Sequence, residues 1–295
     1  MQRVSKKVIS ILVCAVFLLT AVFPALAAVL PTVAAGTTVY SNEKAKVDAS
    51  NAKDGYVMVA YNGAAKSRLK VRVTGPSGTV YTYDLNKNGN YEVFPLSDGN
   101  GKYTVGVYEN TSGNKYALAF STPVTVMLTN DFAPFLRPNQ YVNYSADSQV
   151  VKKAAELTKG KKSDLEKITA IYDFTVKTLT YDKKKAQTVQ SGYLPNVDQV
   201  LASKTGICFD YAALMTAMLR SQGIPTKLVV GYTGNVYHAW INTFIPEKGW
   251  VEGVIFFDGT TWKLMDPTFA SSAKQSQQIM EYIGNGSNYS AKYIY

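Results

Sequence analysis

The sequence predicts an α+β domain preceded by an all-β sandwich domain. Residues 38–128 consist of short runs with period-two alternation, separated by turn residues, which is typical of strands. Residues 149–295 begin with helical periodicity and then return to strands, which is typical of an α+β fold. The segment between them, 129–148, combines prolines with aromatic residues. We therefore expect it to be a packed linker between two domains.

The first 27 residues have the three parts of a secretory signal peptide: a basic start, an apolar run and the small-residue site Ala25-Leu26-Ala27. An uncleaved anchor helix is the alternative, because the apolar run approaches the length of a short membrane span. A lipoprotein signal at Cys14 is disfavoured by the bulky Val13 before it. We expect cleavage after Ala27, no membrane span in the mature chain, and an extracellular or cell-wall-associated protein.

Charge and cysteine content narrow the possible partners. Removal of three basic residues with the signal lowers the net charge from +10 to +7, which favours an anionic cell-wall surface. No basic stripe is interleaved with a recognised binding motif, so nucleic acid is not an expected partner. The mature part keeps one cysteine, Cys208. Without an internal disulfide partner, it is a buried inert thiol, an intermolecular partner or a reactive thiol.

The all-β half shows its strands through alternation. In the run 68–73, basic residues alternate with Leu69, Val71 and Val73, which places these three aliphatic side chains on one face of a strand. Similar runs recur between Gly, Asn and Asp turns as far as residue 128, as expected for a small sandwich of immunoglobulin-like type. Pro123 lies inside the last run and predicts an edge strand or a break there.

Two helices can be placed in the second half. Ser163 and Glu166 form a capping box before apolar residues at helical spacing. Another helix is expected to begin at about Cys208 and to end at Gly223. Its predicted buried face comprises Ala212, Met215, Met218 and Leu219. Strands are expected from residue 226 onward, with hairpin turns at 247–249 and 258–259.

Three side chains suited to nucleophilic catalysis follow one another in order. His238 is the only histidine and lies 30 residues after Cys208, and Asp266 follows 28 residues later. A thiol at a helix start is favoured as thiolate by the helix dipole, and an imidazole oriented by a carboxylate can serve as its base. Asp266 ends the next strand after a hairpin, so we expect it beside the His238 strand. Taken singly, the three are also explained as a core thiol, a core imidazole and a turn residue.

Several sequence blocks, in this order, resemble the transglutaminase-like core, a papain-like α+β fold with a cysteine nucleophile. The blocks are Gly206–Leu214, Leu219–Pro225, Val229–Tyr232, His238–Trp240 and Asp266–Thr268. The resemblance implies Cys208 as nucleophile, His238 as base and Asp266 as the acid that orients the imidazole. It also implies an oxyanion hole with the Cys208 N–H as one donor. Tyr193 and Gln199 are open choices for the second donor.

The predicted function is cysteine-dependent acyl transfer on peptide or side-chain amide bonds, through a thioester on Cys208. Water as acceptor gives a peptidase or amidase, and an amine gives a protein-glutamine transglutaminase. Hydrolysis is slightly preferred, because nothing in the sequence reveals an acceptor-amine site. The expected substrate is a protein or peptide, including cell-wall peptide. The alternative is a noncatalytic cell-wall or protein-binding envelope module, in which Cys208 and His238 are packed residues.

No cofactor or metal is expected. One cysteine and one histidine cannot provide zinc-ligand spacing in the mature chain. Asp84, Asn86, Asn88 and Gly89 begin like a calcium loop, but Pro95 occupies the position of the bidentate glutamate. A polar turn is therefore the expected structure of this segment.

Overall fold

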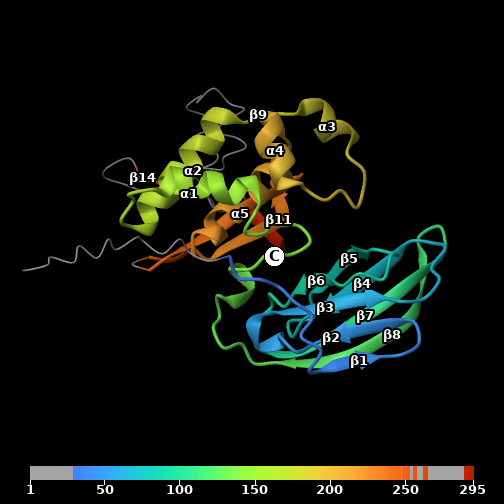
Figure 1. The fold of residues 1–295 in the computed structure, drawn as a ribbon. Helices are drawn as coiled ribbons and strands as arrows, with labels where there is room; N and C mark the ends of the chain where they lie inside the picture. The colour runs from blue at the N-terminus through green and yellow to red at the C-terminus, as the bar shows by residue number, and fades with distance from the viewer. Residues whose placement is uncertain (1–28, 247, 253–254, 258–261, 265–288) are drawn as a thin grey trace, which may run out of the picture.

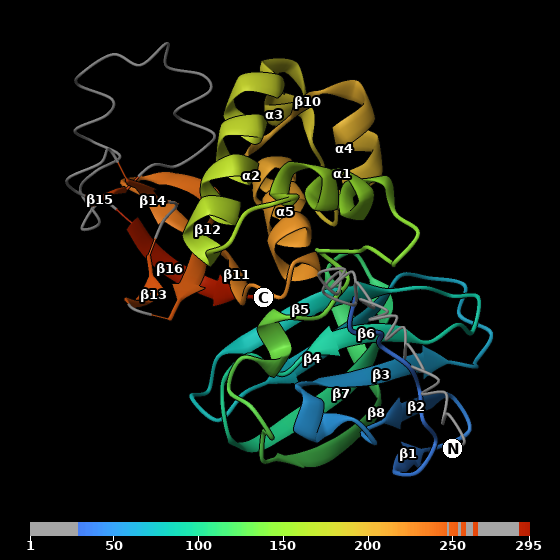
Figure 2. The same ribbon diagram turned by 60° about the vertical axis from the view of Figure 1, so that its left-hand side comes forward.

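The computed structural model describes residues 29–246, 248–252, 255–257, 262–264 and 289–295. These residues form an all-β region and an α+β region, which lie side by side in both views (Figures 1 and 2). The predicted signal peptide, Cys14 and Asp266 lie outside the described residues. Within the described residues, no helix is both long and apolar enough to cross a membrane.

The all-β region consists of two antiparallel four-stranded sheets. In spatial order, the first contains β1 (Val39–Ser41), β2 (Ala45–Asp48), β3 (Tyr56–Tyr61) and β6 (Glu92–Pro95), and the second contains β5 (Val80–Leu85), β4 (Leu69–Thr74), β7 (Gly101–Ser112) and β8 (Lys115–Val126). A short 3₁₀ helix, Ala52–Asp54, precedes β3. The sheets share one core, to which the first contributes Val47 and Val59 and the second Val71 and Val107.

The alternation predicted for this region is confirmed in β4, where Leu69, Val71 and Val73 are all fully buried. Strand β4 has one face on the core, so a period-two pattern is sufficient to orient its side chains. Pro123 lies in β8, which is an edge strand, as its missing N–H predicts. The immunoglobulin-like type of this sandwich and the exact domain boundaries stay predictions.

The segment 129–148 is packed against the α+β region through its aromatic residues. Its short 3₁₀ helix, Ala133–Phe135, is buried. The Phe132 ring lies 4.3 Å from that of Phe244, and the Phe135 ring 5.4 Å from that of Trp250. The prediction of a packed linker is confirmed, since contacts of this kind fix its path.

Five helices are described in the α+β region: α1 (Gln149–Thr158), α2 (Asp164–Thr178), α3 (Lys183–Thr188), α4 (Val197–Ser203) and α5 (Cys208–Ser221). The capping box at the start of α2 is confirmed: Ser163 Oγ accepts from the Glu166 N–H, and Glu166 Oε2 accepts from the Ser163 N–H. The start of α5 at Cys208 is also confirmed. A single buried face for α5 was too narrow a prediction, because every residue from Asp210 to Ser221 is buried. Helix α5 is enclosed by α1, α2, α4 and the sheet.

The sheet of this region has the order β13 (Gly249–Val251), β12 (Val236–Ile245), β11 (Thr226–Thr233) and β16 (Tyr289–Ile294), all antiparallel. The strands β14 (Ile255–Phe257) and β15 (Trp262–Leu264) pair with each other in a separate sheet. Strands β12 and β13 form a hairpin, as expected for residues 247–249, although residue 247 itself is not described. The other predicted turn, 258–259, lies outside the described residues.

The last strand, β16, connects the two regions. It forms the edge of the sheet beside β11, and the C-terminus lies between the regions in Figures 1 and 2. The Tyr295 ring packs edge-on against Tyr81 and Tyr83 of β5 at 5.7 and 5.8 Å. Ser97 Oγ donates to the main-chain oxygen of Ile294 at 2.5 Å. These contacts hold the sandwich against the sheet through a strand that is remote in sequence from both.

Candidate active site

Cys208 is the first residue of α5 and is partly buried. Gly206 precedes it and forms a parallel bridge between β10 (Thr205–Gly206) and β9 (Thr180–Tyr181). A Cβ at Gly206 would lie 2.6 Å from the Cβ of Asp210, so the chain can approach the helix this closely only with glycine. The N–H groups of the first turn lack partners within the helix, and the dipole is positive at this end. The start of α5 therefore has the N–H groups and the dipole end that can hold an anion.

His238 lies in β12 opposite Gly231 of β11 and is 5% exposed. Its ring is nearly parallel to that of Trp240, at 6.3 Å and 19°, which confirms that the two side chains share a face. The Tyr289 ring of β16 lies 6.5 Å from His238 and 5.2 Å from Trp240. A side chain at Gly231 would collide with β16 and with the Trp240 ring. Glycine at this position thus allows the aromatic rings and the strand to pack around the imidazole.

The topology brings Cys208 and His238 to the same end of the helix–sheet interface. Helix α5 packs against β11 and β12, and only residues 222–225 separate the helix from β11. Because the connection is so short, α5 runs back along β11, and the start of the helix lies near the hairpin where β11 ends and β12 begins. His238 is only two residues inside β12 from that hairpin.

Tyr237 provides a second indication of this proximity. Burial raises the pKa of its hydroxyl, and nearby tyrosines and the thiol of Cys208 raise it further when they carry negative charge. Tyr237 therefore lies within electrostatic reach of Cys208, although it belongs to the strand that carries His238. Its ring also packs edge-on against Tyr232 at 5.4 Å. Tyr237 was not predicted as part of the site, because an exposed strand tyrosine has no sequence signal of its own.

The strand before Asp266 does not take the predicted place. Strand β15 pairs with β14, whereas the described neighbours of β12 are β11 and β13. Strand β13 is the next strand after β12, and it ends at Val251. Its pairing with β12 covers Thr243–Ile245, at the other end of the strand from His238. Among the described residues, the strand before Asp266 is therefore not paired with the His238 strand, and the position of Asp266 itself, which lies outside them, stays a prediction.

Asp210 is a buried carboxylate two residues after Cys208, and sequence reasoning assigned it no role. It is 0% exposed and accepts from the Ile207 N–H at 2.9 Å. Lys185 Nζ lies 2.7 Å from its Oδ2, and the Tyr193 hydroxyl donates to its Oδ1 at 2.5 Å. We call Lys185, Tyr193 and Asp210 the acid cluster. An acidic residue three positions after the N-cap is a recognisable capping signal, which would have identified Asp210 but not its partners.

The two open choices for a second oxyanion donor already use their main-chain N–H groups. The Tyr193 N–H donates to the Gln190 oxygen at 3.2 Å, and the Tyr193 hydroxyl belongs to the acid cluster. The Gln199 N–H donates to Asn196 Oδ1 at 3.0 Å in the N-cap of α4. Either N–H could bind a substrate oxygen only after its present bond had broken.

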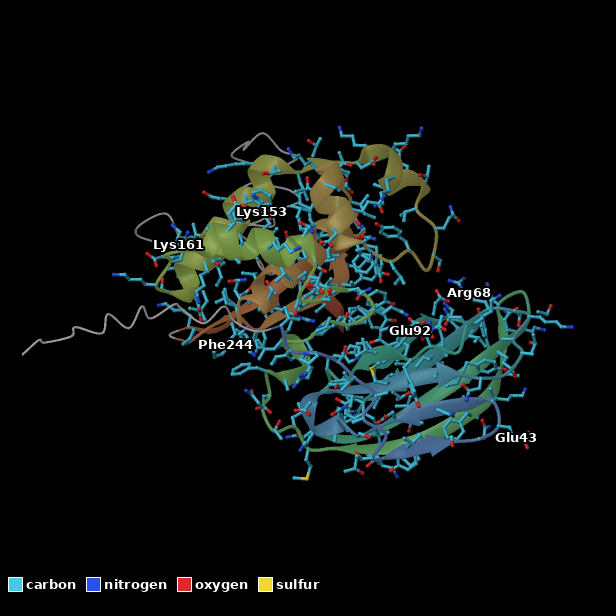
Figure 3. The ribbon with its side chains drawn as sticks, viewed as in Figure 1. Glu43, Arg68, Glu92, Lys153, Lys161 and Phe244 are labelled. Carbon is cyan, nitrogen blue, oxygen red and sulfur yellow. The ribbon has the colours of Figure 1, made fainter. Side chains whose placement is uncertain are left out.

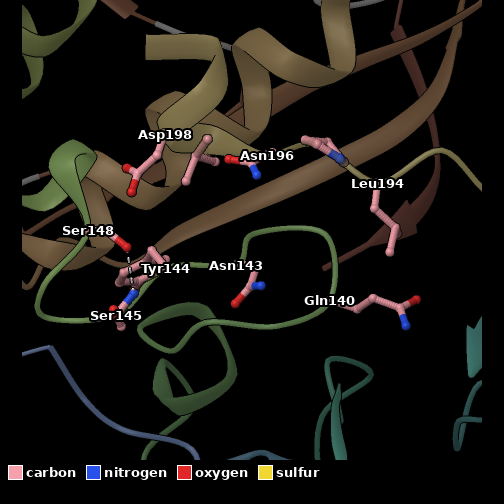
Figure 4. A pocket seen from close by; sticks show the side chains of 10 residues that line it. Gln140, Asn143, Tyr144, Ser145, Ser148, Leu194, Asn196 and Asp198 are labelled. Atoms are coloured by element: carbon pink, nitrogen blue, oxygen red, sulfur yellow. Dashed lines mark hydrogen bonds between the residues drawn. The ribbon is translucent and has the colours of Figure 1, made fainter. Parts of the chain in front are cut away.

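A polar pocket of about 440 Å³ opens between the linker and the start of α4 (Figure 4). Gln140 and Asn143 line it from the linker, and Leu194 and Asp198 from the segment before and within α4. Gln140 Nε2 donates to Glu92 of the sandwich at 2.5 Å, while its buried Oε1 has no partner among the described residues. The pocket thus offers neutral hydrogen-bonding groups, a carboxylate and one exposed aliphatic side chain.

This pocket is linked to the start of α5 on both sides. Leu194 follows Tyr193 of the acid cluster. Gln140 precedes Tyr141, whose ring lies 5.4 Å from Phe209, the residue after Cys208. The pocket walls are therefore one residue away from side chains that contact the first turn of α5.

The sandwich also contacts the segment that carries Tyr193. Arg68 forms two hydrogen bonds with Asp84 at 2.6 Å, and its Nη2 donates to the Ser191 oxygen at 3.3 Å. A Cβ at Gly192 would collide with Arg68 and Asp84. In Figure 3, Arg68 and Glu92 lie on the side of the sandwich that faces the α+β region, and Glu43 lies on the far side. The sandwich therefore supports one wall of the site.

The segment that begins like a calcium loop is a polar turn, as predicted. The carboxylate of Asp84 binds Arg68 and Lys70 at 2.6 and 2.7 Å. The side-chain oxygens of Asn86 and Asn88 accept from N–H groups two residues further along, at 3.1 Å each. The oxygens that a cation would need are thus engaged within the turn.

Comparisons with known proteins agree with the residue pattern. The sequence model of the transglutaminase-like superfamily matches residues 151–253. The uncharacterized protein YebA of Bacillus subtilis is 27% identical over 197 residues, which are 57% of this chain and 26% of the relative. A protein-glutamine gamma-glutamyltransferase of Pseudomonas aeruginosa is 28% identical over 98 residues, which are 28% of this chain and 13% of the relative. The chain thus matches about a quarter or less of the length of these relatives.

Solved structures add only weak likenesses. A protein of Cytophaga hutchinsonii described as a candidate cysteine protease has a TM-score of 0.37 at 17% identity, covering 78% of this chain and 68% of that one. Red sea bream transglutaminase has a TM-score of 0.30 at 12% identity, covering 72% and 48%. No argument rests on these scores. Residues 151–253, which include the helix that begins at Cys208 and the strand that holds His238, match the transglutaminase-like superfamily.

Proposed function

We propose that this chain is an exported, cysteine-dependent enzyme that transfers acyl groups from peptide or side-chain amides. The observation that carries the proposal is the placement of Cys208 at the first position of α5, near the end of β12 that holds His238. The match of residues 151–253 to the transglutaminase-like superfamily supports the same chemistry. Cysteine nucleophiles need a stabilised thiolate and a neighbouring base, and these two positions supply both.

In the proposed reaction, the Cys208 thiolate attacks the amide carbonyl carbon, and the negative charge moves to the carbonyl oxygen. The N–H of Cys208 is the first donor to that oxygen. His238 gives its proton to the amine, the C–N bond breaks, and a thioester remains on Cys208. Water or a second amine then attacks the thioester, gives its proton to His238 and releases the thiolate. Asp266 is proposed to orient the imidazole throughout.

A polypeptide is the substrate that the surroundings favour. The pocket beside Leu194 presents side-chain amides and hydroxyl groups, which suit the alternating donors and acceptors of an extended main chain. We propose that the acyl donor crosses this pocket and presents its amide to Cys208. Hydrolysis is preferred over transamidation, because no acceptor-amine site is identified.

The proposed location is the cell exterior or the cell wall. The basic, apolar and small-residue parts of the first 27 residues support export, and the mature charge of +7 supports attraction to an anionic wall. N-terminal sequencing of the secreted protein should give Ala28 as the first residue. Recovery of the chain with its original N-terminus from the membrane fraction would indicate the uncleaved anchor instead.

The test of the mechanism is the pH dependence of Cys208 alkylation by iodoacetamide, followed by mass spectrometry of the Cys208 peptide. The parent should show an inflection well below the free-thiol value of about 8.5, and His238→Ala should lose it. Cys208→Ala should fold normally and release no amine or ammonia from peptide amides that the parent consumes.

Two results would contradict the proposal. One is alkylation of the parent that rises only near pH 8.5, with His238→Ala unchanged. The other is full turnover by Cys208→Ala. The first result, combined with binding to wall polymer that Cys208→Ala leaves unchanged, would favour the noncatalytic envelope module.

A further inference from the structure

A buried carboxylate lies in the same helical turn as the candidate nucleophile. Asp210 is 0% exposed and follows Cys208 by two residues in the first turn of α5. A negative charge near a thiol disfavours the thiolate, which is the opposite of what a cysteine nucleophile requires. The position therefore demands a compensating charge if Cys208 is to react near neutral pH.

Lys185 supplies that charge from outside the helix. Its Nζ lies 2.7 Å from Asp210 Oδ2 and 2.6 Å from the Tyr193 hydroxyl. Burial alone would lower the pKa of Lys185, but its hydrogen bonds with Asp210 and Tyr193 outweigh burial and raise it. The lysine therefore stays protonated at neutral pH, and the cluster holds a paired anion and cation.

The backbone of α3 fixes the lysine in this place. The side chain of Asp182 accepts from the Lys185 N–H at 2.8 Å and caps α3. The Asp182 N–H in turn donates to the Gly206 oxygen at 2.9 Å, two residues before Cys208. These two hydrogen bonds fix the start of α3 against the residues that precede α5, and the Lys185 side chain therefore reaches the first turn of α5.

We propose that Lys185 is a positioning residue for the acyl-transfer reaction: by pairing with Asp210 it balances the negative charge in the first turn of α5 and holds the 182–196 segment against the start of this helix. The inference rests on the proposed function, in which Cys208 is the nucleophile. Asp210 also has a structural role, because it accepts hydrogen bonds from the Ile207 N–H at 2.9 Å and from the Tyr193 hydroxyl of the acid cluster. Lys185 acts through Asp210 and need not contact the substrate.

The other charged or titratable groups around this turn come from the elements packed against it. They are Tyr237 and His238 of β12, Tyr141 of the linker and Tyr193 before α4. The tyrosines stay neutral below pH 9, because burial, the first cause in each case, raises the pKa of Tyr141, Tyr193 and Tyr237.

The experiment compares the pH midpoint of Cys208 alkylation by iodoacetamide in the full chain and its variants. Lys185→Met leaves the Asp210 charge unpaired, so the midpoint should rise by about one pH unit, as expected for one nearby charge. Asp210→Asn removes the anion and keeps the cation, so the midpoint should fall or stay at the parent value. Lys185→Arg keeps the charge and should hold the parent midpoint.

The alkylation midpoint should move in opposite directions in Lys185→Met and Asp210→Asn if the role of the pair is electrostatic. Loosening of the site would instead shift the midpoints of both variants in the same direction. Lys177→Met is the matched control: Lys177 pairs with Asp173 at 2.9 Å on the exposed face of α2 and should leave the midpoint unchanged. Should Lys185→Met fail to fold by circular dichroism, Asp210→Asn and Lys185→Arg still test the direction.

Equal midpoints in the parent, Lys185→Met and Lys177→Met, or a rise in Asp210→Asn, would overturn the inference. Failure of this inference and failure of the proposed function give different midpoints and can be distinguished. A parent midpoint near that of a free thiol would count against the nucleophile, whereas the difference between Lys185→Met and the parent reports on the charge pair alone.

Discussion

The two ends of α5 each bury one charged side chain, and they balance it in different ways. At the N-terminal end, Asp210 is paired with a cation, Lys185 at 2.7 Å. At the C-terminal end, Arg220 donates to the main-chain oxygens of Thr226, Arg137 and Tyr295 at 2.9, 2.6 and 2.7 Å. Within the described part of the chain, no carboxylate pairs with it. Both signs suit the helix dipole, with the acid first and the base last.

The difference indicates that the charged residue at one end of α5 affects reactivity and the one at the other end affects stability. The Arg220 contacts connect three remote parts of the chain: the linker, β11 and the C-terminal residue beyond β16. Burial lowers the pKa of Arg220 to about 10, so it is charged throughout the neutral range and offers no titration near neutral pH. Asp210, in contrast, lies beside Cys208, and its neutralisation depends on one lysine from another segment. A change at the first end should alter reactivity, and a change at the second should alter stability.

The largest expected effect is on stability, from Arg220→Met. The variant removes the Arg220 donor from the main-chain oxygens of Thr226, Arg137 and Tyr295, of which the last keeps the Leu228 N–H. Each oxygen left without a donor costs about 1–3 kcal/mol, partly offset because a charge is no longer buried. We expect a loss of about 3 kcal/mol in the free energy of unfolding, measured by urea denaturation. The alkylation midpoint of Cys208 should not change.

Arg72→Met is the control for this prediction, because Arg72 is exposed on β4 above the Tyr108 ring, 5.5 Å away. Its loss should cost less than about 1 kcal/mol. If both variants unfolded at the same urea concentration, the Arg220 hydrogen bonds would not be what stabilises the contact between the linker, β11 and the C-terminal residue.

The next largest effect is expected from Gly192→Ala, which acts on the outer support of the acid cluster. Gly192 has a φ of +88°, and a Cβ there would meet Arg68 and Asp84 of the sandwich. The new methyl group must displace the far ends of the Arg68 and Asp84 side chains, which are flexible and move at small cost. We expect a loss of about 1.5 kcal/mol in unfolding free energy, of which about 1 kcal/mol comes from the left-handed backbone alone.

Gly160→Ala provides the matched control. Gly160 has a φ of +78°, and a Cβ there meets nothing within 4 Å. It should therefore lose only the backbone contribution of about 1 kcal/mol. Equal losses in the two alanine variants would show that the sandwich does not support this wall of the site.

What could be predicted from the sequence depended on whether the signal was local. Leu69, Val71 and Val73 revealed their strand because a sheet with one buried face repeats every two residues. The start of α5 near Cys208 was visible because Ala212, Met215, Met218 and Leu219 recur at helical spacing, and Gly223 and Pro225 mark the end of the helix. The position of Cys208 at a helix N-terminus was therefore predictable from its neighbours alone.

The remaining features depend on contacts between segments that are far apart in the chain. Lys185 meets Asp210 across 25 residues, and Arg220 meets Arg137 and Tyr295 across 83 and 75. No periodicity encodes such pairs, and lysine or arginine is ordinarily expected at the surface. For the same reason, the insertion of β16 beside β11 could not be predicted from its serine- and tyrosine-rich sequence.

The smallest effect is expected from Asp84→Asn, which removes an ion pair that is partly open to solvent, in contrast to the buried charges of α5. Burial would raise the pKa of Asp84, but its hydrogen bonds with Arg68 and Lys70 outweigh burial and lower it. A carboxylate with a lowered pKa stabilises the fold above its unfolded value of about 3.9, and this contribution is lost as the pH falls through the folded value. Asp84→Asn should therefore lower stability at pH 7 but not near pH 2. Because Arg68 and Asp84 are 45% and 24% exposed, the loss should stay below about 1 kcal/mol. Urea denaturation at both pH values measures the difference, and 1 M salt should reduce it at pH 7. A loss as large as that in Arg220→Met would mean that this pair behaves as a buried one, and the sandwich would then hold the site as firmly as α5 does.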